Sequence, residues 1–299
     1  MTARPTELAA LPCVLRWESP ASWLTRAALS QGVEMRALLE YLGIADHIDS
    51  DLAFLGEEFP RISARCGFEK GAFFEARYVM TSLLKVDRTG TRFLLRTDSG
   101  RPRYRICPRC ALEDSTPYLA FHCRFSAWRF CPEHHCMLED ACWACGAAIR
   151  LPANLAGAGP MQGKCAYLSQ CSSCGKSHTR APVVYLDAWA SFITLFERMQ
   201  LDNGRATLAA LLERRVLLHG NERKPLSYLR QIERMGLLGT KARAPTADLL
   251  RERQAACEAA NFSSVDQPGV VLPVIRQGSQ EIDCSGVNCS GPLLGAVES

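Results

Sequence analysis

Residues 130–146 read FCPEHHCMLEDACWACG and contain two pairs of metal-ligating side chains. Cys131 and His134 form the first pair, and Cys142 and Cys145 form the second. Two residues separate the members of each pair, and a turn of this length lets both side chains face one metal ion. A structural zinc ion requires four ligands, so each pair needs a second pair from elsewhere in the chain.

Two further pairs flank this stretch. Cys107 and Cys110 precede it in the sequence CPRC, and Cys171 and Cys174 follow it in the sequence CSSC. The chain has 15 cysteines, and its N-terminus lacks the apolar core and cleavage site of a signal peptide. We therefore expect a cytoplasmic protein, in which clustered cysteines bind metal and do not form disulfides.

The order in which the pairs combine distinguishes two architectures. Neighbouring pairs either share a metal or alternate between two metals, as in a cross-braced RING-type module. RING-type modules leave only a few residues between the histidine and the next cysteine, whereas seven residues separate His134 from Cys142. The sequential arrangement is favoured, with two structural zinc ions whose predicted ligands are Cys107, Cys110, Cys131 and His134 for the first and Cys142, Cys145, Cys171 and Cys174 for the second.

The alternative to zinc binding is that these cysteines are buried and free. Among the others, Cys136 has no correctly spaced mate, so we expect it to pack as a small apolar residue. Cys123 and Cys165 are the alternative ligands. If the zinc reading is right, a strong chelator should unfold residues 107–174, because metal binding supplies folding energy to a segment with little apolar core.

The sequence before the zinc region predicts helices. Residues 19–43 begin with Ser19 as a helix cap and Pro20 at the first helical position, and Gly32 divides them into two helices. Two helices joined by a short glycine turn are typical of a helix-turn-helix unit, and an ordinary helical hairpin fits the pattern equally well.

Three other segments have weaker signals. Residues 91–96 and 103–107 flank a Gly-Arg-Pro turn and are expected to be short strands or extended arms. Residues 151–164 are rich in Gly, Ala and Pro, which predicts a flexible excursion.

The predicted fold is mainly α-helical with small β elements of the zinc-ribbon or zinc-knuckle kind. A helix-turn-helix-like N-terminal domain covers residues 1–105, tandem zinc fingers cover 106–182, and a C-terminal helical, helix-turn-helix-like domain covers 183–256. Residues 257–299 have no apolar periodicity, so we expect a disordered tail.

Charge is concentrated in two blocks, although the net charge is only +4. Arginine and lysine outnumber acidic residues in residues 85–109 and again in residues 205–253. Such blocks are typical of phosphate-binding surfaces, and solvated helix faces are the plain alternative.

Catalytic and membrane-spanning patterns are missing from the sequence. It has no Gly-rich phosphate loop, no H-E-x-x-H motif and no convincing carboxylate pair, so we expect no enzyme activity. A cysteine nucleophile at Cys136 or Cys123 is the weaker alternative. No run of about 18 apolar residues is present, which predicts no transmembrane helix.

The zinc-region motifs, in their order, resemble those of the TniQ/TnsD family of transposition proteins. That family combines a C-P-x-C, a downstream Pro-Tyr, here Pro117 and Tyr118, and a longer Cys/His pattern ending in glycine. The residues that match the longer pattern are Cys131, His134, Leu138, Cys142, Cys145 and Gly146. The opening of the family is also similar, and its matching residues are Ser19, Ser22, Trp23, Leu24 and Arg26.

The resemblance covers roughly residues 10–180 and implies an accessory factor of DNA transposition that does not cut DNA itself. Such a factor marks a target and recruits an AAA+ ATPase regulator, which brings in the transposase. The expected partners are therefore this ATPase and either target DNA or a DNA-targeting complex, with a homodimer as a further expectation and no membrane partner. The predicted DNA contacts are Arg92, Arg96, Arg101, Arg103, Arg105, Arg214, Arg215, Arg223 and Lys224.

Two other functions compete with this one. A zinc-dependent transcription regulator would read DNA through the second helix of residues 19–43, which offers only a thin set of polar side chains with two acids among them. A RING-like protein-interaction module is disfavoured by the spacing after His134.

Overall fold

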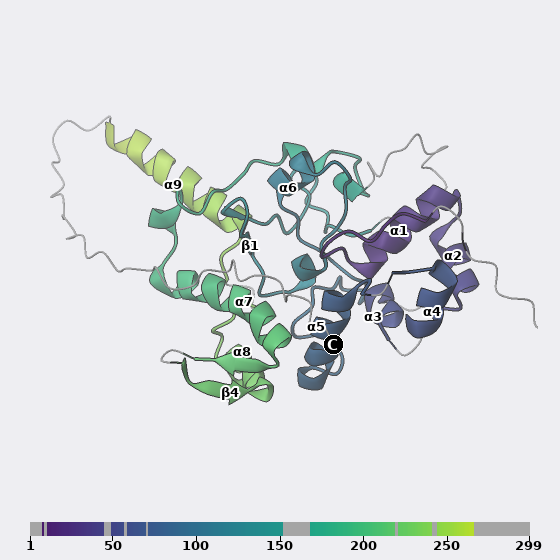
Figure 1. Ribbon diagram of the computed structural model, residues 1–299. Helices are drawn as coiled ribbons and strands as arrows, with labels where there is room; N and C mark the ends of the chain where they lie inside the picture. The colour runs from purple at the N-terminus through teal and green to yellow at the C-terminus, as the bar shows by residue number, and fades with distance from the viewer. Residues whose placement is uncertain are drawn as a thin grey trace, which may run out of the picture. The chain divides into compact units, whose positions relative to one another are not determined.

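The structure is a computed structural model, and it describes residues 8, 11–44, 49–56, 59–69, 71–151, 168–218, 221–240 and 244–265. These residues form a mainly helical fold with two small antiparallel sheets, as predicted (Figure 1). The α-helices are α1 (Pro20–Gln31), α2 (Met35–Leu42), α3 (Ser50–Phe54), α4 (Phe59–Cys66), α5 (Phe74–Val86), α6 (Pro108–Glu113), α7 (Leu195–Glu213), α8 (Leu229–Arg234) and α9 (Ala247–Val265). The strands are β1 (Phe130–Cys131) paired with β2 (Cys136–Met137), and β3 (Arg215–Leu217) paired with β4 (Arg223–Pro225).

The two helices predicted within residues 19–43 are confirmed as α1 and α2. The Ser19 side chain accepts a hydrogen bond from the Ser22 amide and caps α1, and Gly32 ends the helix with φ of 65°. Glycine adopts this left-handed conformation without the steric cost that a Cβ would bring. Helix α1 is buried on nearly every side, whereas α2 keeps Arg36 and Glu40 exposed.

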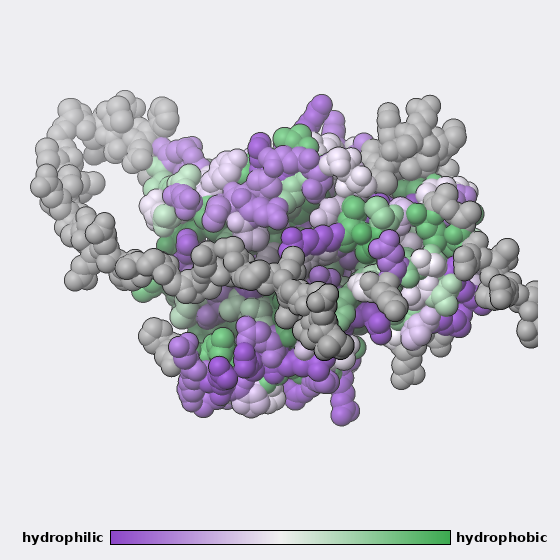
Figure 2. Space-filling view, viewed as in Figure 1, coloured by the Kyte–Doolittle hydropathy of each residue, from purple (hydrophilic) through white to green (hydrophobic). Residues whose placement is uncertain are grey.

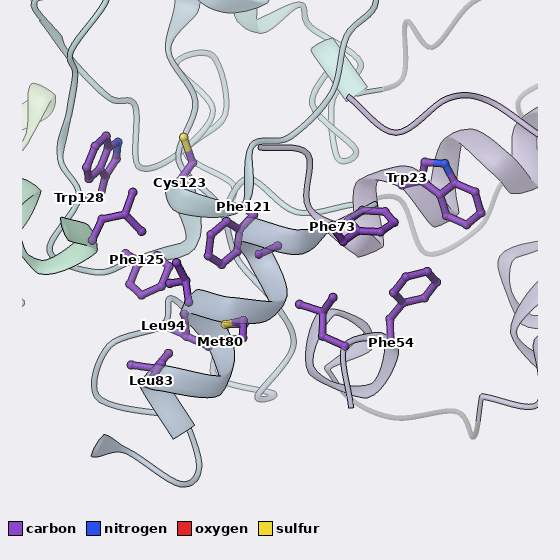
Figure 3. Packing of buried hydrophobic residues seen from close by; sticks show 14 of the residues in the cluster. Trp23, Phe54, Phe73, Met80, Leu83, Leu94, Phe121, Cys123, Phe125 and Trp128 are labelled. Atoms are coloured by element: carbon purple, nitrogen blue, oxygen red, sulfur yellow. The ribbon is translucent and has the colours of Figure 1, made fainter. Parts of the chain in front are cut away.

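Aromatic side chains fill the core between α1 and the segments that follow it (Figure 3). The ring of Phe54 lies 5.9 Å from that of Trp23 and 5.3 Å from that of Phe73, in tilted and edge-to-face contacts. Farther along the same core, the rings of Phe121 and Phe125 meet edge to face at 5.4 Å. Offset and edge-to-face ring pairs add stabilisation beyond the area that they bury.

A buried ion cluster joins the N-terminal helices to the zinc region. The Arg124 guanidinium is fully buried and donates to the carboxylates of Asp49 and Asp51 at 2.6–2.9 Å. Asp51 also accepts from the Tyr104 hydroxyl at 2.7 Å. Burial, and then the negative charge of Asp51, raise the pKa of Tyr104 well above its usual value, so the phenol keeps the proton that it donates.

The C-terminal helices are positioned by specific contacts. Thr194 and Glu197 form a capping box at the start of α7. The Arg253 guanidinium on α9 pairs with both oxygens of Glu197 at 2.7 and 2.9 Å. Gly204 in α7 lies so close to Ala127 that a Cβ at position 204 would fall 2.0 Å from the Ala127 carbonyl oxygen.

Three expectations about segments need revision or lie partly outside the described residues. Residues 91–93 form a turn, whereas residues 94–96 and 103–107 are extended arms with isolated bridges, such as Leu94 with Phe125, which is one of the two predicted alternatives. Helix α9 continues to Val265, so the predicted tail begins inside a helix, and residues 266–299 lie outside the description. Most of the predicted excursion over 151–164 also lies outside it.

One hydrophobic core contains residues from all three of the predicted folded domains. The cluster that contains Trp23 also contains Cys131 from the zinc region and Leu211 from α7. These residues belong to one compact unit, Met1–Cys257. Within the described ranges, no helix combines the length and the apolar character that crossing a membrane requires.

Candidate metal centres

The structure brings the eight predicted ligands together as two separate groups. Within each group the ligand atoms all lie within 4.8 Å of one another. The pairs combine in sequence order, so the cross-braced arrangement of a RING-type module does not apply. The first group is Cys107, Cys110, Cys131 and His134, and the second is Cys142, Cys145, Cys171 and Cys174.

In the first centre, a helix start faces a short hairpin. Cys107 is the N-cap of α6, and Pro108 occupies the first helical position, where a missing amide hydrogen carries no cost. The Cys110 amide points at the Cys107 sulfur at 3.5 Å, which would stabilise a thiolate there. Cys131 ends β1, and the turn into β2 carries His134.

The imidazole of His134 is oriented by an acid on α6. Its Nδ1 faces the three sulfurs at 3.3–3.6 Å, while its Nε2 lies 2.8 Å from Glu113 Oε2. Nδ1 is therefore the ligand atom, and the Nε2 hydrogen is donated to the carboxylate. A carboxylate in this position fixes the ring and makes the nitrogen a better ligand.

The donor separations fit zinc. Tetrahedral zinc with bonds of about 2.3 Å to sulfur and about 2.0 Å to nitrogen places sulfurs about 3.8 Å apart, and sulfur and nitrogen about 3.5 Å apart. The Cys110 and Cys131 sulfurs are 3.7 Å apart. In the second centre, the Cys142–Cys174 and Cys145–Cys171 sulfur pairs are also 3.7 Å apart. Each group therefore fits one tetrahedral zinc ion.

The second centre consists of two knuckles with the same backbone pattern. The amide of Gly146 donates to the Cys142 carbonyl at 2.8 Å, and the amide of Gly175 donates to the Cys171 carbonyl at 2.9 Å. Both glycines have φ of 70°, which explains why glycine follows each C-x-x-C pair. Among the residues that the structure describes, this centre has no helix equivalent to α6.

The two centres differ in exposure. Cys107 and Cys131 belong to the main hydrophobic core, whereas Cys145 and Cys174 are exposed. Burial opposes ionisation of Cys171, but the amides of Cys174 and Ser173 donate to its sulfur, and the pKa of this thiol falls to about 7. The second centre therefore contains a thiol that ionises readily, Cys171, and two ligands that are exposed to solvent and chelators, Cys145 and Cys174.

Sequence reasoning missed Glu113. Glu113 lies three residues beyond Cys110, about one helical turn further along α6. This spacing could have indicated a carboxylate beside the first metal centre. Cys136 behaves as predicted, since it is fully buried in the core. Its sulfur lies 3.5 Å from that of Cys107, but it is not a member of either ligand group.

Arg105 is a wrong prediction among the proposed DNA contacts. Its side chain is only 2% exposed, and its Nε donates to Asp140 at 2.7 Å. Its Nη1 donates to three backbone carbonyls at 2.8–3.0 Å, those of Phe125, Ser126 and Trp128. These internal acceptors occupy the group, so it is not available to a phosphate.

The other predicted arginines of this block differ in accessibility. Arg96 forms an ion pair with Asp49 at 3.0 Å, and Arg103 donates to the Asp140 carbonyl at 2.7 Å. Both side chains are therefore partly engaged inside the protein. Arg92 and Arg101 are exposed.

The second predicted group lies around the β3–β4 hairpin. Arg214 stacks on the Tyr78 ring at 4.1 Å, and Arg223 is exposed. Lys224 pairs with Glu222 at 2.5 Å, and Arg215 pairs with Glu213 at 3.0 Å. These pairs are on the surface, where a polyanion competes effectively with a single carboxylate. Contact of this group with DNA stays a prediction.

Comparison with known proteins identifies a family for part of the chain. The TniQ family model matches residues 12–138, a range that includes α1 and the whole first metal centre. No curated protein and no solved structure matches the chain. Residues 12–138, somewhat under half of the chain, therefore match a TniQ domain.

Proposed function

We propose that this protein is a non-catalytic accessory factor of DNA transposition, a zinc-binding adaptor that links target DNA, or a DNA-targeting complex, to an AAA+ ATPase regulator. The observation that carries the proposal is the TniQ domain over residues 12–138. A TniQ domain suggests an accessory role in transposition, which supports this part of the proposal.

The metal centres support a structural role for zinc. Each centre supplies four protein ligands, so a bound zinc ion would have no open position for water or substrate. Zinc bound here would hold α6 against the β1–β2 turn and would hold the two knuckles of the second centre together. Neither centre is arranged for hydrolysis.

Reconstituted transposition tests the proposal. The full chain is combined with the ATPase and transposase of its own mobile element, a donor DNA and a target plasmid, and the insertions are sequenced. We expect insertions at preferred target positions only when the chain is present. We also expect the ATPase to co-purify with the tagged chain, while the chain alone leaves the target DNA uncut.

Two outcomes would contradict the proposal. Insertions of equal number and position with and without the chain would remove the accessory role. An ATPase that never co-purifies with the zinc-loaded chain, with or without nucleotide, would remove the adaptor role. Zinc content is measured in each preparation, because a metal-depleted chain would fail for a different reason.

A further inference from the structure

Two basic segments that are far apart in the sequence meet at the end of α5. The Arg230 guanidinium on α8 donates to the backbone carbonyls of Val86 and Lys85. The loop that follows α5 therefore lies against α8, and the two basic blocks of the sequence contribute to one surface.

The junction is concave. A hollow of about 340 Å³ is lined by Val86, Asp87, Arg88, Thr89, Thr91, Arg92, Arg230 and Arg234. A second hollow of about 290 Å³ is lined by Pro225, Ser227, Tyr228, Arg230, Gln231 and Arg234. The two hollows share Arg230 and Arg234, so they are adjacent, and we call them together the arginine groove. It extends from the loop after α5 across α8 to β4, a region covered largely by hydrophilic residues in Figure 2.

Positive charge dominates the arginine groove. The side chains of Arg88 and Arg234 are exposed and form no hydrogen bond or ion pair with the described residues. Asp87, the acid among these lining residues, is buried, and its carboxylate accepts from the Thr89 hydroxyl and the Arg92 amide.

Glu233, an acid beside the groove, is already paired with Arg92. The Glu233 side chain is 14% exposed and lies 4.0 Å from the Arg92 guanidinium. The guanidinium groups of Arg88 and Arg234 are exposed as hydrogen-bond donors without an acceptor among the described residues. An acceptor-rich anion is the chemistry that complements such a surface.

We infer that the arginine groove binds the sugar-phosphate backbone of duplex DNA. Pro225 at one edge of the groove ends β4, the strand that also carries Arg223 and Lys224, so several cations lie in and beside the groove and suit a repeating polyanion better than a single phosphate. The inference rests on the proposed function, because it assigns the DNA contact of the adaptor to a defined surface. Contacts of this kind position a protein on DNA without reading its sequence.

The test uses the full zinc-loaded chain and the double substitution Arg88→Glu with Arg234→Glu. Both side chains are exposed and form no hydrogen bond with the described residues. Arg230 is left unchanged because its hydrogen bond to the Val86 carbonyl holds α8 against the end of α5. The matched control is Arg36→Glu with Arg150→Glu, which makes the same charge change at exposed positions elsewhere. Circular dichroism and zinc content verify that both variants are folded.

Binding to a short fluorescent duplex of unrelated sequence is followed by anisotropy over a range of salt concentrations. The groove variant should bind at least about tenfold more weakly, and the slope of log K against log salt should fall by about two. The control variant should change affinity by less than about twofold, since its charges lie outside the groove.

Three outcomes would overturn the inference: equal losses in the groove and control variants, a wild-type affinity that does not depend on salt, or preferential capture of duplex RNA in a competition arm. The same preparations are tested for ATPase capture and insertion targeting. If these persist while DNA binding does not depend on the groove, the groove inference alone fails. If groove-dependent DNA binding persists without ATPase capture, the proposed function alone fails.

Discussion

Ser22 illustrates how a single small side chain joins two distant parts of the molecule. Its hydroxyl donates to the Glu18 carboxylate at 3.2 Å and accepts from the Leu119 amide at 3.0 Å. Arg26 pairs with the same glutamate at 2.7 Å, and the Trp23 indole donates to the Pro12 carbonyl at 2.9 Å. The family motif of α1 therefore connects the N-terminal helices to the zinc region through hydrogen bonds, and its residues are not among the metal ligands.

Asp51 has three buried hydrogen-bond partners in the ion cluster, which leads to a stability prediction. Replacing Asp51 by Ala removes acceptors from the Arg124 guanidinium, the Tyr104 hydroxyl and the Ala21 amide, all of them buried. Breaking one partner of a buried pair costs about 3–5 kcal/mol, because the remaining charge is left in an apolar setting. Urea denaturation measures the free energy of unfolding.

The control for that experiment is Asp98→Ala. Asp98 is exposed, so its loss should change the free energy of unfolding by no more than about 0.5 kcal/mol. An Asp51 variant that unfolds at the same urea concentration as this control would contradict the importance of the cluster.

Glu113 provides a test of how the first zinc centre is tuned. Glu113→Gln keeps the size of the side chain but weakens the hydrogen bond that orients the His134 ring. We expect zinc affinity to fall by about 10- to 100-fold in chelator competition. Glu133→Gln is the matched control, because Glu133 also lies beside this centre, 4.0 Å from the Cys110 sulfur, without touching the imidazole. Equal losses in both variants would indicate a general effect of charge.

At the scale of elements, α7 is positioned by close contact with the backbone at Ala127. In an exposed helix, replacing glycine by alanine stabilises by about 1 kcal/mol. At Gly204 the added methyl would fall 2.0 Å from the Ala127 carbonyl oxygen, so the helix must move. We expect Gly204→Ala to lower the melting temperature, with a loss of about 1–3 kcal/mol in stability.

The reverse substitution on the same helix is the control. Ala209 is exposed on α7, and Ala209→Gly should cost only the intrinsic propensity difference of about 1 kcal/mol. A Gly204 variant that melts above the wild type would show that the helix has room to move away from Ala127.

At the scale of the whole molecule, the two metal centres should differ in their order of release. Cys145 and Cys174 of the second centre are exposed, whereas Cys107 and Cys131 of the first centre pack in the main core. With increasing chelator, we expect one zinc to leave while the helical circular dichroism is largely retained. Loss of the other zinc should coincide with cooperative unfolding.

Single-site variants identify which centre releases first. Cys145→Ser should leave one tightly held zinc and a folded protein, and Cys110→Ser should destabilise the entire compact unit, because its centre shares the core. A Cys110 variant that keeps normal stability while the Cys145 variant unfolds would reverse the assignment.

The sequence by itself determined the local features of this protein. The four pairs, their sequential grouping and the glycine-ended knuckles follow from spacing, because a C-x-x-C turn involves only neighbouring residues. The two helices of residues 19–43 followed from Ser19, Pro20 and Gly32 for the same reason.

Only the tertiary structure decided which charged residues face solvent. In the sequence, Arg105 and Arg88 belong to the same basic block. In the structure, Arg105 donates to buried carbonyls, whereas Arg88 lies in the arginine groove. Glu113 beside His134 and Gly204 against Ala127 are likewise contacts between separate elements. Burial and contact at long range depend on how elements pack together, and residue spacing along the chain does not specify that packing.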